Sequence, residues 1–210
     1  MYRMSTQFFS FAATLLLAGM LACGDGAPRD ETGGMAGSAS AGDTPPLAAD
    51  TIPSPGMTGD LSDANIAALL DHANEADSSA GSLAAKKATN SQVKKFGQMM
   101  MADHHQLRKQ GTDLAKKLNI TPQPPPDDPV TPLAQQEMDA LKKAEKGPDF
   151  DRTYIQQEIT AHQAVLDLLN QSHETAGNAE LKALIEKTRP LVENHLEQAK
   201  AIEKELGAKA

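Results

Sequence analysis

Four residues that could do chemistry occupy positions where helical spacing would otherwise place apolar side chains. The four are Asp77, His104, His162 and His195. Each has apolar residues about one turn before and one turn after it, and the three histidines are half of the six in this 210-residue chain. Three imidazoles and a carboxylate that converge inside a protein would form a ligand set for a divalent transition metal: zinc, copper, iron or manganese. Asp103 and Glu158, which are close in sequence to two of the histidines, are possible further contributors.

The same four residues also have a purely structural interpretation. Asp77 could pair with one protonated histidine, while the other histidines hydrogen-bond to the backbone or to water. A buried polar group left without a partner costs roughly 1–3 kcal/mol, and this penalty is what favours a ligand. The sequence therefore leaves both metal binding and packing open. We expect His72, His105 and His173, which lie off the apolar faces or near helix ends, to be exposed to solvent.

Helices must position these residues. The chain has five Phe, two Tyr and no Trp, which disfavours an all-β fold, and residues 61–210 are rich in good helix formers. Apolar residues spaced alternately by three and four predict long helices over about 62–88, 90–118, 151–175 and 178–206. The segment 122–132 holds six prolines in eleven residues, which predicts an extended crossover followed by a short helix over about 133–145 that Gly147-Pro148 closes. Pro190 is expected to kink the last helix.

The lengths of the connections predict how these helices pack. Links of one to three residues make the first two long helices, and likewise the last two, antiparallel neighbours. Two such hairpins joined by a long crossover form the ferritin-like arrangement of a four-helix bundle. Counting back from each hairpin turn places Asp77 roughly 3 Å from the height of His104 along the bundle, and His162 roughly 4.5 Å from that of His195. The fold class is thus predicted to be all-α, with the four polar residues at similar heights.

The first 23 residues have the pattern of an export signal with an anchor. A basic start, Met1 to Arg3, precedes a mostly apolar stretch of 14 residues, Phe8 to Leu21, which is too short to span a bilayer as an ordinary helix. The stretch ends in Ala22-Cys23 and resembles the lipobox of bacterial lipoproteins. The resemblance implies cleavage after Ala22, acylation of Cys23 and, because Gly24 follows, sorting to the outer membrane. An ordinary secretory signal with a stray cysteine is the alternative.

The following segment, residues 24–60, predicts a disordered tether. Of its 37 residues, 31 are Gly, Ala, Pro, Ser, Thr or Asp, so it can bury little apolar surface. The sequence thus divides into a signal peptide (1–22), an acylated cysteine with a tether (23–60) and a helical domain (61–210). The net charge of −8 argues against nucleic acid as a partner, because that affinity needs a basic face.

Several short motifs in a fixed order resemble one bacterial family. They are Val93-Lys94-Lys95-Phe96, Met99-Met100, Asp103-His104, Phe150-Asp151-Arg152-Thr153-Tyr154-Ile155, His162-Gln163-Ala164-Val165-Leu166, Leu181-Lys182, Arg189-Pro190 and His195-Leu196. The family, domain of unknown function 4142, comprises exported or outer-membrane proteins. Membership would imply a ferritin-like four-helix fold and a location in the cell envelope, but no known activity.

Known catalytic motifs are missing from the sequence. Di-iron enzymes with this architecture carry Glu-x-x-His on two helices, and no Glu-x-x-His occurs in this chain. No nucleophile elbow, phosphate-binding loop or zinc-protease motif occurs either, so we do not expect an enzyme. The hypothesis is a periplasm-facing lipoprotein, anchored in the outer membrane, whose bundle binds a divalent transition metal. The alternative is a structural or stress-related interaction protein of the envelope without metal or catalysis, and its protein partner is not identified.

Overall fold

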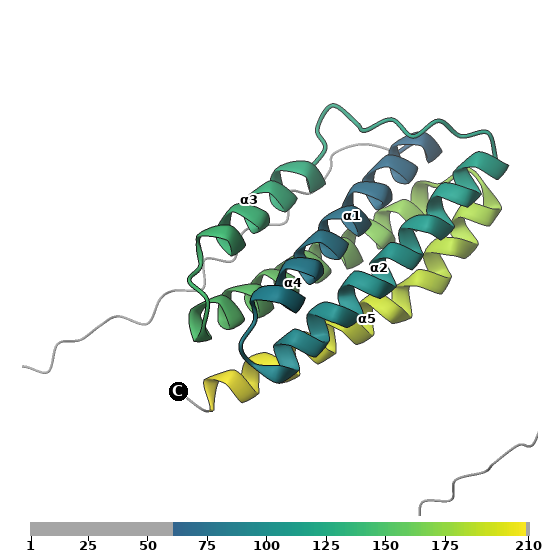
Figure 1. Ribbon diagram of the computed structural model, residues 1–210. Helices are drawn as coiled ribbons and strands as arrows, with labels where there is room; N and C mark the ends of the chain where they lie inside the picture. Colours follow the sequence, from purple (N-terminus) through teal and green to yellow (C-terminus); the bar gives the residue numbers. More distant parts are fainter. Residues whose placement is uncertain (1–60, 209–210) are drawn as a thin grey trace, which may run out of the picture. The chain divides into compact units, whose positions relative to one another are not determined.

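The computed structural model describes residues 61–208, and over this range it contains helices and loops only. The helices, shown in Figure 1, are α1 (Asp63–Lys87), α2 (Ser91–Lys117), α3 (Val130–Lys143), α4 (Pro148–Thr175) and α5 (Ala179–Gly207). The predicted all-helical class is confirmed. The predicted signal peptide 1–22, Cys23 and the tether 24–60 lie outside the described residues. None of the helices in the described part is long and apolar enough to cross a membrane.

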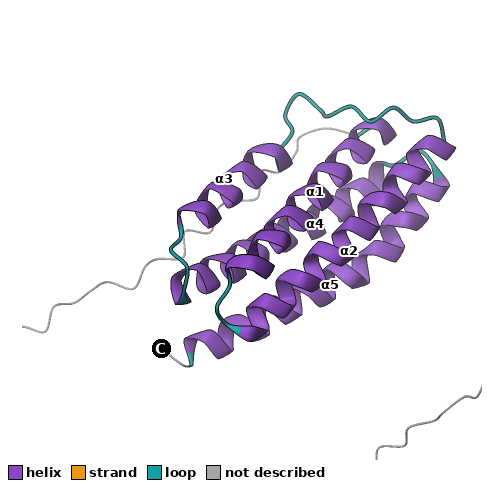
Figure 2. Cartoon of the chain, viewed as in Figure 1, coloured by secondary structure: helices purple, strands orange, loops and turns teal. Residues whose placement is uncertain are grey.

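The four long helices pack as two hairpins. Residues 88–90 join α1 to α2, and residues 176–178 join α4 to α5, so each pair is antiparallel. α1 also packs on α4, and α2 on α5, which closes a helical bundle. Residues 118–129 carry the chain from α2 across one end of the bundle to α3, and α3 lies against α1 and α4 (Figure 1; Figure 2).

One aspartate at each end of the bundle binds a hairpin turn to the opposite hairpin. The buried carboxylate of Asp151, in the first turn of α4, accepts hydrogen bonds from the backbone N–H groups of Thr89 and Asn90 and from the Thr89 hydroxyl, at 2.7–3.0 Å. At the other end, Asp63 of α1 accepts one from the backbone N–H of Gly177 at 2.8 Å. Because both turns are held by the other hairpin, the heights of residues on the four helices are fixed relative to one another.

The structure corrects two expected helix boundaries near prolines. α3 begins at Val130 rather than near Leu133, because the Asp128 carboxylate accepts hydrogen bonds from the first two N–H groups of the helix. Pro132 lies in that first turn, where its missing N–H would have had no helical partner anyway. Gly147-Pro148 does not simply close the short helix, since Pro148 is the first residue of α4, a favoured position for proline.

Apolar side chains fill the bundle in two separate clusters. One surrounds the turn between α1 and α2 and includes Phe96, Met100, Phe150 and Tyr154. The other lies toward the turn between α4 and α5 and includes Ile66, Leu69, Leu169 and Ile185. Between these clusters, each long helix carries one of the polar residues that the sequence analysis found on an otherwise apolar helix face.

Candidate metal centre

The four long helices each contribute to one buried polar layer. Asp77 comes from α1, His104 from α2, Glu158 and His162 from α4, and His195 from α5. All five side chains are almost inaccessible, with exposed fractions between 0% and 3%. The layer lies between the two apolar clusters.

The three histidines form a nearly equilateral triangle. Their ring centroids are 5.4 Å (His104–His162), 5.2 Å (His104–His195) and 5.5 Å (His162–His195) apart. One ring nitrogen of each histidine lies within 4.8 Å of one ring nitrogen of both others. Three side chains from three helices therefore point toward a common region.

In two of the three histidine rings, one nitrogen forms a hydrogen bond to an oxygen acceptor. His162 Nδ1 lies 2.9 Å from the backbone carbonyl oxygen of Glu158, and His195 Nε2 lies 3.0 Å from the Asp103 carboxylate. Because a carbonyl and a carboxylate oxygen can only accept, the ring nitrogen must donate its proton to them. The second nitrogen of each ring, His162 Nε2 and His195 Nδ1, then carries a lone pair.

The third ring is held in the same way. His104 Nδ1 lies 3.0 Å from Asn74 Oδ1, and the Asn74 amide nitrogen donates to the backbone oxygen of Leu70 at 2.6 Å. That second hydrogen bond fixes which end of the amide faces the histidine, so Asn74 accepts and His104 Nδ1 donates. His104 Nε2 is left with the lone pair. Outer partners of this kind fix the tautomer and orientation of histidines that bind metals.

The three lone-pair nitrogens have no partner within the described protein. His104 Nε2, His162 Nε2 and His195 Nδ1 are buried and make no hydrogen bond there. Burial lowers the pKa of His162 to about 4, lowers that of His104 well below its ordinary value, and lowers that of His195. The positive charge that His195 would carry lowers the pKa of His104 and His162 further, and that of His162 also lowers the pKa of His104. The histidines are therefore neutral near pH 7, which is the form that binds a metal.

Asp77 belongs to a second group of polar atoms beside the histidine triangle. A carboxylate oxygen of Asp77, one of Glu158 and a ring nitrogen of His162 form a second group of atoms within 4.8 Å of one another. Asp77 also approaches His104, with its Oδ2 3.3 Å from Nδ1. His162 is common to both groups. Glu158, expected as a possible contributor, belongs to the second group, whereas Asp103 only orients His195.

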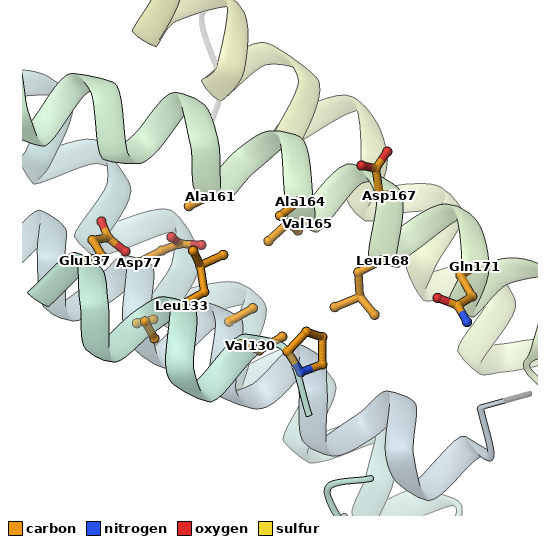
Figure 3. A pocket seen from close by; sticks show the side chains of 14 residues that line it. Asp77, Val130, Leu133, Glu137, Ala161, Ala164, Val165, Asp167, Leu168 and Gln171 are labelled. Atoms are coloured by element: carbon orange, nitrogen blue, oxygen red, sulfur yellow. The ribbon is translucent and has the colours of Figure 1, made fainter. Parts of the chain in front are cut away.

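The short helix α3 adds a carboxylate that the sequence analysis missed. Glu137 is 3% exposed, and its Oε1 has no hydrogen-bond partner in the described protein. It lines a cavity of about 100 Å³ between α1, α3 and α4, and Figure 3 shows it beside Asp77 at one end of that cavity. Leu133, Glu137 and Leu141 are each four residues apart, a pattern that marks one face of a helix and could have revealed Glu137.

The carboxyl groups in this interior prefer to hold protons. Burial raises the pKa of Asp77 to about 7. Burial, and then the charge of Asp77, raise the pKa of Glu137 to about 8. Burial also raises the pKa of Glu158 well above its ordinary value, and the charges of Asp77 and Glu137 add to that shift. These acids become fully charged at neutral pH only if a cation is near.

The other histidines lie at or near the surface, as expected. His105 is exposed, His72 lies 3.5 Å from the Asp128 carboxylate, and His173 lies 2.7 Å from that of Glu186. The side chains of His72 and His173 are 37% and 35% exposed, so solvent screens both pairs. None of these three histidines belongs to either buried group.

A comparison with protein-family models matches residues 48–202 to a family described as a domain of unknown function, DUF4142. No curated protein and no solved structure matches the chain.

Proposed function

The chain belongs to the DUF4142 family, and from its buried geometry we propose that its bundle binds a divalent transition metal through His104, His162 and His195. Asp77 lies against His104 Nδ1 and not against the lone-pair nitrogen Nε2, so it would balance the charge of the ion rather than bind it. The observation that carries this proposal is that three buried imidazole nitrogens, each with its tautomer set by an outer acceptor, have no partner among residues 61–208.

The energetic cost of the arrangement supports a ligand. Each unpartnered buried nitrogen costs roughly 1–3 kcal/mol, and apolar side chains of similar size would fill the same space without that penalty. A metal ion would accept all three lone pairs at once. The side chains are already oriented, so little ordering entropy is lost when the ion binds.

The donor atoms limit the kind of metal. Imidazole nitrogen suits zinc, copper and iron, whereas magnesium and calcium prefer oxygen. Zinc sites commonly combine three protein ligands with a fourth position for water or a carboxylate, at about 2.0–2.2 Å from the ion. A histidine triangle with one adjacent carboxylate resembles this donor set most closely.

The experiment is a metal titration of the full chain, purified in detergent without a polyhistidine tag. We expect about one zinc ion per chain by elemental analysis, and a higher melting temperature when zinc is added at pH 7.5. His162→Leu should abolish both results. His105→Leu is the matched control, since this exposed residue neighbours His104 on α2, and it should behave as the wild type does.

A chain with no metal content and no metal-dependent change in melting temperature, tested with zinc, copper, iron and manganese, would overturn this proposal. The structural or stress-related envelope protein described above would then be favoured. In that case the hydrogen bonds of Asn74, Asp103 and Glu158 to the histidines serve packing alone.

We further propose that this bundle is ferritin-like and that the protein is a lipoprotein held at the outer membrane, facing the periplasm. The sequence around Cys23 supports the anchor, and the composition of residues 24–60 supports a tether between it and the bundle. Cys23→Ser should leave the protein soluble or unprocessed, because acyl chains would be its attachment to the membrane. Unchanged membrane fractionation and lipid labelling of this variant would refute the anchor.

A further inference from the structure

A group of carboxylates beside the histidine triangle supplies no ligand atom to the metal site proposed above. Asp77, Glu137 and Glu158 reach the interior from α1, α3 and α4, and their exposed fractions are 3%, 3% and 0%. Both carboxylate oxygens of Glu158, and one of Glu137, lack a hydrogen-bond partner in the described protein. No lysine or arginine among residues 61–208 is buried with them. The nearest donors to these acids are ring N–H groups: His104 Nδ1 lies 3.3 Å from Asp77 Oδ2, and His162 Nδ1 lies 3.3 Å from Glu158 Oε2. The Tyr154 hydroxyl also interacts with Glu158. These neutral donors do not balance the charge of three ionised acids, which are costly to bury without a cation.

The spacing of two of these carboxylates, those of Asp77 and Glu158, suits one cation. An oxygen of Asp77, an oxygen of Glu158 and a nitrogen of His162 all lie within 4.8 Å of one another. Two oxygen ligands on opposite sides of an ion at about 2.2 Å would be about 4.4 Å apart, so the separations match a shared ion. His162 Nδ1 donates to the Glu158 carbonyl, which leaves the carboxylates as the main donors.

We propose that Asp77 and Glu158 bind a second divalent cation of the oxygen-preferring class, best represented by Mn²⁺, and that Glu137 holds this cation through water in the adjoining cavity. The bundle would then hold two adjacent cations, one bound mainly by nitrogen and the other mainly by oxygen. The inference rests on the proposed function for the identity of its neighbour, but the two sites use different donors and can be tested separately. Carboxylate and water ligands suit manganese, magnesium and calcium, and Mn²⁺ is the ion of this class that electron paramagnetic resonance detects.

The cavity beside α3 gives this site an approach and room for water. Asp77 and Glu137 lie at one end of the cavity, and the rest of its wall is mostly apolar, with Val130, Leu133 and Leu168 among the lining residues (Figure 3). Its volume of about 100 Å³ exceeds the roughly 30 Å³ that one water occupies in the liquid. Water molecules there could link Glu137 to an ion bound by Asp77 and Glu158 and complete its coordination.

The α3 helix is what brings the third carboxylate into this group. Its buried residues are Glu137 and Leu141, and the Lys87 ammonium holds its end by donating to the backbone oxygen of Leu141 at 2.9 Å. The residues that the crossover helix buries fully against the bundle are therefore one leucine and one acid. A helix needed only to cover the bundle would bury two apolar residues there.

The test measures zinc and manganese separately on the full chain in detergent. Elemental analysis after gel filtration should give one Zn²⁺ and one Mn²⁺ per chain when both metals are supplied. Glu137→Gln and Glu158→Gln should weaken Mn²⁺ binding at least tenfold and leave Zn²⁺ binding unchanged. His195→Leu, which removes a residue outside the carboxylate group, should do the reverse.

Glu145→Gln is the matched control, because it makes the same chemical change at an exposed position just after α3. It should bind both metals as the wild type does. Gln has the size of a protonated Glu, so both interior variants should fold, and circular dichroism and melting temperature verify this. Electron paramagnetic resonance of the Mn²⁺ bound to zinc-loaded protein gives an independent count of the second site.

The outcomes separate the two proposals. A chain that binds zinc but no manganese, or whose manganese binding is unaffected by both glutamine variants, overturns the carboxylate site and leaves the histidine site standing. A chain that binds manganese, sensitive to Glu137 and Glu158, but no zinc overturns the proposed function and supports the carboxylate site. Binding of neither metal overturns both proposals.

Discussion

The same four long helices bury apolar side chains at the two ends of the bundle and polar side chains in its middle. At the ends, apolar side chains such as Leu69, Phe150 and Ile185 are completely buried against one another. In the middle layer the same helix faces bury polar groups instead, and Glu158 and His195 are as inaccessible as any leucine. The change occurs within about one turn along each helix, so the backbone does not distinguish the regions.

The comparison shows which region maintains the fold. Burying a large apolar side chain stabilises the folded chain by about 1.5–3 kcal/mol, whereas an unpartnered polar group in the same surroundings opposes folding. The ends therefore stabilise a layer that does not stabilise itself in the metal-free protein. This division predicts that substitutions at the ends and in the middle differ in size and, without metal, in sign.

The largest effect is expected at the ends. Leu69→Ala should lower the free energy of unfolding by about 2–5 kcal/mol, because it leaves a cavity among fully buried neighbours. Urea denaturation monitored by circular dichroism measures this change, and any variant that still folds should keep its metal content. A loss below about 1 kcal/mol would show that this end of the bundle is loosely packed, contrary to the comparison.

The next effect is expected in the middle layer, and its sign depends on metal. Without metal, His162→Leu should leave the free energy of unfolding unchanged or raise it, since leucine removes an unpartnered nitrogen from an apolar interior. At a zinc concentration 100 times the dissociation constant, the wild type should gain about 2.7 kcal/mol that the variant lacks. Equal destabilisation of the variant with and without zinc would indicate a structural role for His162.

A smaller effect is expected from pH in the metal-free protein. In the folded protein, Asp77, Glu137 and Glu158 have raised pKa values, about 7 for Asp77 and about 8 for Glu137. Their contribution to the stability of the folded protein is therefore lost as pH rises from about 4 through these folded values. The pKa values of His104, His162 and His195 are lowered in the folded protein. The folded protein therefore becomes more stable as pH rises from these folded pKa values to about 6.5, where free histidine titrates. The two trends oppose each other below pH 6.5, and only the carboxyl groups act above it.

Stability of the metal-free protein should therefore fall between pH 6.5 and pH 8, by about 1–3 kcal/mol. Thermal unfolding across this range measures the decline, and Glu137→Gln should reduce it because one titrating acid is removed. Bound cations should also reduce it, since they favour the charged carboxylates. A melting temperature that is flat or rising over this range in metal-free protein would contradict the raised pKa values.

The histidines were predictable because a polar residue on an apolar helix face is visible as a break in spacing. Counting from the hairpin turns also gave their heights, and the caps at Ser62, Asn90 and Asn178 start α1, α2 and α5 in the structure. Height does not give rotation about the helix axis, however. The sequence could not show that Asp77 faces Glu158 rather than all three histidines.

The other residues of the site could not be predicted, because their positions depend on long-range packing. Glu137 interrupts an apolar spacing on α3, but its distance from Asp77 depends on the path of residues 118–129, which no local pattern specifies. Asn74 orients His104 across 30 residues of sequence, and only the packing of α1 on α2 brings them together. Boundaries near Pro132 and Pro148 were wrong because proline is tolerated in a first turn, so it does not always end a helix.

The smallest effect is expected at a surface pair that matches an interior one. His173 Nε2 lies 2.7 Å from the Glu186 carboxylate, much as His195 Nε2 lies 3.0 Å from that of Asp103. The contacts are alike, but His173 is 35% exposed and His195 is 0% exposed. Because solvent and salt screen the surface pair, His173→Gln should change the free energy of unfolding by less than about 1 kcal/mol, and less still in high salt.

The same substitution at the interior pair should separate contact from burial. His195→Gln retains a side chain that can donate to Asp103 but removes the lone-pair nitrogen that faces the other histidines. We expect it to abolish zinc binding, whereas His173→Gln should leave zinc stoichiometry unchanged, as elemental analysis of both variants would show. If His173→Gln also reduced bound zinc, the surface histidines would contribute to the measured metal, and the buried triangle could not be its only source. If neither variant changed it, the bound zinc would lie outside both pairs, because only His195 has its second nitrogen in the buried layer between the two apolar clusters.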